Sequence, residues 1–200
     1  MEKLVKTIGK LFNREEVIIG ALGDSLTYGW MTERGFLDYL NDMLKKKYPD
    51  SPFKILNRGI PGDTARDGLR RLDREIIRFN PDLVMIQFAL NDAYTEFSPD
   101  NFKNNIDMII SKVKEKTNSE IALLTSVTLI DPRENIIAED FYSRITELGL
   151  KYNIPVVSVH EYWKKKISEG AVHSTLVQFD GVHPTEKGYQ LMAEAVFELF

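Results

Sequence analysis

Two short segments, far apart in this sequence, carry the residue types that make a hydroxyl group nucleophilic. The sequence GDSLT at residues 23–27 supplies a serine, and DGVHP at residues 180–184 supplies an acid and an imidazole three residues apart. In such a set the imidazole takes the serine proton, and the acid fixes the tautomer and stabilises the imidazolium that forms. The pattern predicts Ser25 as nucleophile, His183 as general base and Asp180 as orienting acid.

Alternating strand and helix patterns must bring these segments together. After a short amphipathic helix at the start of the chain, apolar runs predict strands and apolar residues at helical spacing predict helices. We expect strands at 17–22, 53–57, 83–88, 121–125 and 156–159, and helices at 35–47, 65–79, 101–117, 136–152 and 186–200. The alternation predicts an α/β fold, a three-layer α/β/α sandwich with a five-stranded parallel sheet in the flavodoxin-like order 2-1-3-4-5. We expect one domain over residues 1–200.

In that order, three polar or flexible positions lie at adjacent strand ends. Ser25 follows the first strand, Gly59 the second and Asn91 the third. Attack on an ester carbonyl puts negative charge on its oxygen, which needs preorganised donors at roughly 2.7–3.1 Å. The backbone N–H groups of Ser25 and Gly59 and the side-chain amide of Asn91 are the expected donors, and glycine suits position 59 because it lacks a blocking Cβ.

Four separated motifs resemble those of the GDSL esterases, also called SGNH hydrolases. They are GDSL at 23–26, the single Gly59, the pair Asn91-Asp92, and Asp-x-x-His at 180–183. Their order and spacing match over nearly the whole chain. The resemblance implies a carboxylic ester hydrolase that works through an acyl-enzyme, with no metal and no organic cofactor.

The sequence departs from this family at one position and is similar to one of its branches at another. Ala89 stands where the family usually has glycine, and its methyl group is expected to shift Asn91 slightly or to narrow the pocket. The sequence GDT at 62–64 is similar to the bacterial thioesterase and lysophospholipase branch. A thioesterase or lysophospholipase, a carbohydrate acetylesterase and an acyltransferase therefore remain alternatives.

A different class with the same strand order is a flavodoxin-like nucleotide-binding module. Such a module predicts a phosphate-cradling loop, but neither G-x-G-x-x-G nor G-x-x-x-x-G-K-[ST] occurs in this sequence. The G-x-S-x-G elbow of the other large esterase fold is also missing, because Thr27 occupies its last position. These observations favour a GDSL-type hydrolase.

Two further histidines and four bulky residues need an interpretation. His173 is a rival base without an acid at a useful spacing, and His160, at the end of the last strand, is expected to be structural. The bulky residues either line an acyl pocket or pack as core or lid: Tyr28, Trp30, Leu129 and Ile130. No long apolar stripe indicates a deep tunnel, so we expect acetyl to butyryl esters as substrates.

Composition narrows the partners and the compartment. The 200 residues carry a net charge of −4, so no broad basic surface favours nucleic acid. Cysteine is absent, which fits a reducing compartment and excludes a thiolate nucleophile. The first 16 residues lack an apolar signal-peptide core, and no apolar stretch reaches the roughly 18 residues of a membrane span. We expect a cytoplasmic enzyme acting on a small-molecule ester.

Overall fold

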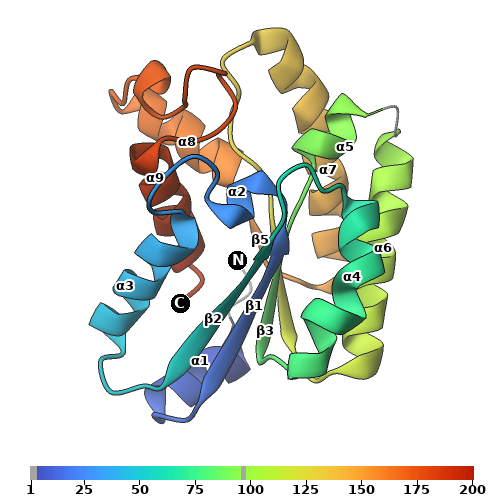
Figure 1. The fold of residues 1–200 in the computed structure, drawn as a ribbon, viewed down its shortest axis with the longest axis vertical. Coiled ribbons are helices and arrows are strands. Elements are labelled where there is room, and N and C mark those ends of the chain that lie inside the picture. Colours follow the sequence, from blue (N-terminus) through green and yellow to red (C-terminus); the bar gives the residue numbers. More distant parts are fainter. Residues whose placement is uncertain (1–3, 96–97) are drawn as a thin grey trace.

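The computed structural model of the chain describes residues 4–95 and 98–200; residues 1–3 and 96–97, part of the expected domain span, lie outside the described residues. Five parallel strands form one sheet in the order β2-β1-β3-β4-β5, which confirms the predicted order (Figure 1). The strands are β1 (Val17–Gly23), β2 (Phe53–Gly59), β3 (Leu83–Gln87), β4 (Glu120–Leu124) and β5 (Val156–Val157).

Helices cover both faces of the sheet, which confirms the three-layer sandwich. One layer contains α4 (Ala65–Glu75), α6 (Pro99–Lys116) and α7 (Pro132–Tyr152), and the other contains α3 (Phe36–Lys47), α8 (Val159–Ser168) and α9 (Glu186–Phe197). Across the sheet, the connection from β1 to β2 runs toward one edge, and the connections from β2 to β3, β4 and β5 run toward the other. Right-handed crossovers therefore place the connecting helices on opposite faces. The first helix, α1 (Val5–Phe12), lies at the lower end of the view in Figure 1.

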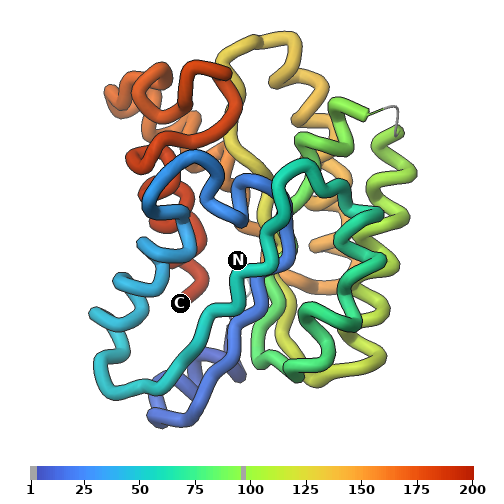
Figure 2. Tube along the Cα trace, viewed as in Figure 1, coloured from blue at the N-terminus to red at the C-terminus, as the bar shows by residue number. Residues whose placement is uncertain are grey.

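Two adjacent interior strands, β1 and β3, explain why the functional loops start level with one another. β1 and β3 are almost entirely buried, as near-continuous apolar runs in a sheet covered on both faces must be. Gly23 at the end of β1 is paired with Gly59 on one side and with Gln87 on the other. The loops after these strands and the segment around residue 180 meet at one end of the molecule, as the tube in Figure 2 shows.

Several boundaries differ from the sequence-based expectations. The helix expected over 65–79 ends at Glu75, and a short 3₁₀ turn, η1 (Ile77–Phe79), follows. The expected strand 156–159 stops at Val157, because Val159 begins α8, which was not predicted. α7 starts four residues before the expected position 136, because Asp131 caps it and Pro132 occupies its first turn. Two short helices, α2 (Ser25–Tyr28) and α5 (Leu90–Tyr94), were also missed.

No helix within residues 4–95 and 98–200 is long and apolar enough to cross a membrane.

Candidate active site

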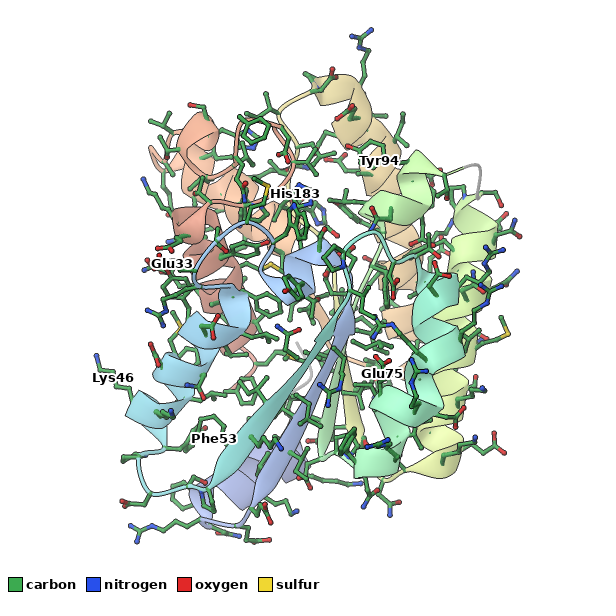
Figure 3. All side chains as sticks on the ribbon, in the orientation of Figure 1. Glu33, Lys46, Phe53, Glu75, Tyr94 and His183 are labelled. Carbon is green, nitrogen blue, oxygen red and sulfur yellow. The ribbon has the colours of Figure 1, made fainter. Side chains whose placement is uncertain are left out.

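The structure brings the predicted serine, histidine and acid into one hydrogen-bonded chain. His183 Nε2 lies 3.0 Å from Ser25 Oγ, and His183 Nδ1 lies 2.7 Å from Asp180 Oδ2. Figure 3 shows His183 beside α2, at the end of the sheet opposite Phe53. This arrangement can move a proton from the serine hydroxyl to Nε2 while the carboxylate holds Nδ1–H in place.

A tight turn holds the acid against the imidazole. Asp180 Oδ1 accepts the backbone N–H groups of Val182 and His183, both at 2.9 Å, and Gly181, directly after Asp180, adopts a positive φ of 72°. Burial by itself raises the pKa of Asp180, but hydrogen bonds from Val182 and His183 outweigh it and leave the pKa below its usual value. The carboxylate is therefore charged wherever the imidazole can act as a base.

Gln178 ties this turn to the loop that follows the serine. Its Nε2 donates to the carbonyl oxygens of Trp30 (3.0 Å) and Pro184 (2.9 Å), and its backbone N–H donates to His183 O at 2.7 Å. Sequence reasoning missed this residue, because a lone glutamine in a polar loop carries no pattern. The side chain links the two halves of the site across the gap between α2 and the loop before α9.

Ser25 is the first residue of α2, and Asp24 fixes the turn that presents it. The Asp24 carboxylate is buried and accepts the Leu26 N–H at 2.9 Å and Gln87 Nε2 at 3.3 Å. Thr27 Oγ1 donates to the other side of the same Gln87 amide at 2.7 Å. Burial raises the pKa of Asp24 to about 7. Asp24 thus caps α2.

The pair Asn91-Asp92 clamps the turn before α4. Asn91 Nδ2 donates to Asp63 O at 2.9 Å, which occupies one of its two amide hydrogens. The buried Asp92 carboxylate accepts the Ala65 N–H at the start of α4, with both oxygens at 3.1 Å, and burial raises its pKa to about 7. The amide of Asn91 is therefore held at the edge where the third strand ends.

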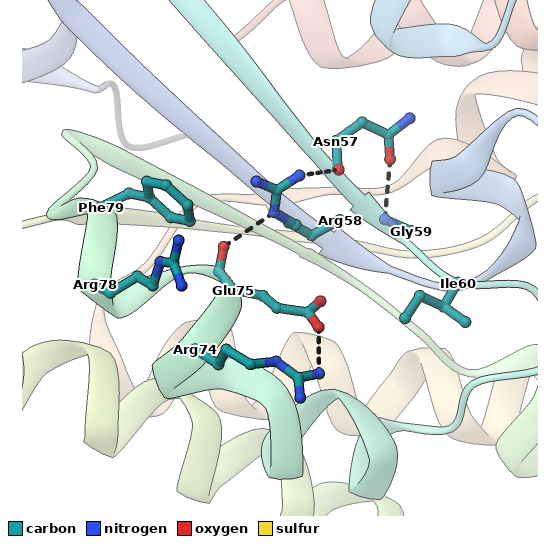
Figure 4. Close-up of a pocket in the computed structure, with 8 residues that line it drawn as sticks. All are labelled: Asn57, Arg58, Gly59, Ile60, Arg74, Glu75, Arg78 and Phe79. Carbon is teal, nitrogen blue, oxygen red and sulfur yellow. Dashed lines mark hydrogen bonds and ion pairs between the residues drawn. The ribbon is translucent and has the colours of Figure 1, made fainter.

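Gly59 does not present its N–H as expected. That N–H donates instead to Asn57 Oδ1 at 2.9 Å, as the close-up in Figure 4 shows. A Cβ at this position would lie 2.2 Å from the Tyr28 nitrogen, so glycine is required here for the close approach of β2 to α2. Gly59 thus has a packing role in this structure, and its donor is already used.

The turn directly after β2, at residues 60–63, contains another backbone donor. Asp63 N–H donates to Ile60 O at 3.1 Å, with Pro61 and Gly62 between them and Gly62 at a φ of 85°. Proline at the second position and a glycine with positive φ at the third are typical of a type II turn. The N–H of Gly62 takes no part in the bond that closes such a turn. Asn91 contacts the same turn through Asp63 O.

The other two histidines lie in structural contacts. His173 Nε2 lies 3.1 Å from the Thr128 carbonyl oxygen, and its ring meets Trp163 edge-on. His160 lies in the first turn of α8, not at a strand end, and its Nδ1 lies 2.9 Å from Thr125 Oγ1. His183, rather than His173, is the imidazole bonded to Ser25. In the part of the chain that the structure describes, no three His, Cys, Asp or Glu side chains group as a metal site.

The four bulky residues expected around an acyl pocket fall into two groups. Tyr28, Trp30 and Ile130 are exposed near the site, with 54%, 38% and 45% of their surface accessible, whereas Leu129 is buried in the core. Phe179 is almost fully exposed directly before Asp180, and sequence reasoning missed it. A cavity of about 520 Å³ lies there, lined by Ile130, Asp131, Glu134, Ser174, Val177, Gln178, Phe179, Asp180 and Gly181. The site is therefore open beside Asp180. Leu129 is not among the residues that line this cavity.

Comparisons with known proteins bear on the family and the fold of the chain. The sequence profile of the GDSL-like Lipase/Acylhydrolase family matches residues 21–191. An arylesterase of Vibrio mimicus is 27% identical over 178 residues, covering 88% of this chain and 84% of that protein. A thioesterase 1/protease 1/lysophospholipase L1 of Escherichia coli is 25% identical over 175 residues, covering 86% and 78%. The crystal structure of an acetylxylan esterase from Geobacillus stearothermophilus has the same fold, with a TM-score of 0.81, 19% identity, and coverage of 92% and 93%.

Proposed function

Because the chain belongs to the GDSL-like lipase/acylhydrolase family, we propose that it is a serine ester hydrolase in which Ser25 is the nucleophile. Membership of this family makes the chain a carboxylic ester hydrolase. The single observation that carries the assignment of residues is the continuous chain from Ser25 Oγ through His183 to Asp180, with links of 3.0 and 2.7 Å. The nucleotide-binding alternative has no such support.

The reaction proceeds in two halves. Ser25 Oγ attacks the ester carbonyl carbon while its proton passes to His183 Nε2, and the tetrahedral intermediate then breaks its bond to the alcohol oxygen. That alcohol leaves with the proton from His183. Water then attacks the acyl-enzyme by the same route, giving its proton to His183, which returns it to Ser25 as the acid is released. Asp180 stabilises the imidazolium in both halves.

The negative charge on the carbonyl oxygen meets donors from the ends of three strands. We assign this role to the Ser25 N–H, to the second amide hydrogen of Asn91 and, in place of Gly59, to the N–H of Gly62. The type II turn supports Gly62, because its own closing bond leaves that N–H unused. Gly59 is not favoured, because its N–H already donates to Asn57.

The substrates are small acyl esters, from acetyl to butyryl. The exposed rings of Tyr28 and Trp30 and the open cavity beside Ile130 support a shallow site that leaves a long chain in water. Each methylene that meets an apolar wall gains up to about 0.8 kcal/mol, and each one left in solvent gains little. The names of two relatives keep a lysophospholipase or thioesterase and a carbohydrate acetylesterase as alternatives. The single domain over 1–200 and the cytoplasmic location stay proposals from sequence and composition.

Two measurements test this proposal. Ser25→Ala should lower kcat by at least about 10³-fold and leave the unfolding midpoint unchanged, as losses of a nucleophile do. For the substrate, kcat/KM on nitrophenyl esters should peak between acetyl and butyryl and fall by octanoyl. Near wild-type hydrolysis by Ser25→Ala contradicts the mechanism, and a kcat/KM that climbs through decanoyl contradicts the short-chain assignment.

A further inference from the structure

A buried arginine on α4 lies at the centre of the hydrogen bonds behind the site. Arg71 is only 6% exposed, yet its guanidinium reaches four different acceptors. Its Nε donates to Asp63 Oδ2 (2.7 Å), Nη1 to the Arg58 carbonyl (2.7 Å) and Glu75 Oε2 (2.8 Å), and Nη2 to the Gly23 carbonyl (2.9 Å). A buried cation is tolerated only when paired in this way.

Three of these acceptors belong to segments that build the active site. Gly23 ends β1 and stands two residues before Ser25, and Arg58 lies at the end of β2. Asp63 closes the turn that contains Gly62, and its carbonyl oxygen receives the Asn91 amide. The guanidinium therefore connects the strand that presents the nucleophile with the turn that holds the amide.

The fourth acceptor, Glu75, lies on the same helix as Arg71 and away from the site. It lines the cavity of Figure 4, where its carboxylate also bonds Arg74. Asp63 and Glu75 are thus two carboxylates that accept hydrogen bonds from the same guanidinium. Only Asp63 belongs to the turn that contains Gly62 and binds the Asn91 amide. Burial raises the pKa of Asp63, and the hydrogen bond from Arg71 opposes that rise.

We propose that Arg71 is a positioning residue for ester hydrolysis, acting through Asp63 to hold Asn91 and through Gly23 to hold the strand end before Ser25. The inference rests on the proposed function, because it assigns Asn91 to the developing oxyanion. A planar guanidinium is needed for this role: it presents donors in several fixed directions, whereas a lysine ammonium is a single point charge. Small displacements of a donor matter, because a shift of about 1 Å can cost about 100-fold in rate.

The two carboxylates supply a matched pair of variants. Asp63→Asn weakens the arm that reaches the turn, and Glu75→Gln weakens the arm that stays on α4. Asp63→Asn should lower kcat about 10- to 100-fold with little change in KM, because it displaces the Asn91 amide, whose bond to the carbonyl oxygen strengthens only as charge develops there. Glu75→Gln should keep the wild-type kcat even where it lowers the unfolding midpoint. Equal kcat values for the two variants would overturn the inference.

A double-variant cycle separates positioning from general stability. If Asp63 acts through Asn91, adding Asp63→Asn to Asn91→Ala should cost little more kcat than Asn91→Ala alone. If instead the loss of kcat in the double variant equals the product of the losses in the two single variants, the inference is overturned. Arg71→Lys should lower kcat in the same way, and Asp63→Asn keeps the test valid where that variant does not fold. A Ser25→Ala variant that still hydrolyses esters refutes the proposed function itself, whereas an inactive Ser25→Ala beside a fully active Asp63→Asn refutes only the role of Arg71.

Discussion

Replacing Ala89 with glycine should reveal strain stored next to the site. Ala89 lies between β3 and α5, is completely buried, and adopts a φ of 149° with a ψ of −43°. A residue with a Cβ rarely adopts positive φ, and such a conformation costs about 1–3 kcal/mol. Glycine adopts it freely. The strain should therefore disappear in Ala89→Gly.

Two destabilising terms oppose the relief of strain in Ala89→Gly. Glycine costs about 0.5–1 kcal/mol in backbone entropy, and loss of one buried methyl group costs about 0.8 kcal/mol. With strain relief of about 1–3 kcal/mol, the net result lies between a loss of about 1 and a gain of about 2 kcal/mol. Ala122→Gly is the matched control, because Ala122 is equally buried within β4 and outside the set of positive-φ residues.

Urea unfolding measures the free energy of unfolding of both variants. The control should lose about 1.3–1.8 kcal/mol from the entropy and methyl terms alone. Ala89→Gly should then be more stable than Ala122→Gly by the strain energy, about 1–3 kcal/mol, at an unchanged m-value. Equal losses in the two variants would refute the reasoning. Hydrolysis by Ala89→Gly should stay close to wild type, because Asp63 O still holds the Asn91 amide.

Three other predictions follow from the site. Asn91→Ala should lower kcat by about 10²–10³-fold with KM almost unchanged, and a raised KM with a constant kcat would place Asn91 in ground-state binding. His183→Ala should abolish turnover and His173→Ala should not, because His173 bonds the Thr128 carbonyl; steady-state rates with an acetyl ester decide it. Burial raises the pKa of Asp24 from 3.8 to about 7, so the folded state binds this proton more tightly than the unfolded chain. That stabilisation is complete below about pH 4 and disappears as the pH rises through 7. The unfolding midpoint of the wild type should therefore fall more between pH 5 and pH 8 than that of Asp24→Asn, and parallel profiles would contradict this.

The architecture was predictable because its signals are local. Apolar runs mark the strands, and the rule of right-handed crossovers turns their alternation into one strand order. Ser98 and Pro99 likewise mark the start of α6, where the serine hydroxyl accepts the Asn101 N–H. α8 was missed because its first residue, Val159, follows the two valines of β5 after a single serine, so the strand pattern and the helix pattern overlap.

The details of the site depended on contacts that residue types do not reveal. Gly59 was expected to offer a free donor, but the side chain of Asn57, two residues earlier, accepts that N–H. Leu129 has the same character as Ile130, yet the chain direction after β4 buries one side chain and exposes the other. Arg71, on a highly charged helix, has the pattern of a solvated residue, and only the packing of α4 against the strand ends makes it a buried link.

The central claim is that Ser25 is the residue that becomes acylated, and covalent labelling tests it most directly. An organophosphonate ester phosphonylates an activated serine: Oγ attacks the phosphorus and its alcohol leaving group departs. Because the phosphonyl-enzyme hydrolyses slowly, mass spectrometry of the digested protein can locate the labelled residue. We predict one label per chain, on the peptide that contains Ser25, with complete loss of ester hydrolysis and no label in Ser25→Ala or His183→Ala. A label on any other residue, or undiminished hydrolysis by protein labelled at Ser25, would contradict the account.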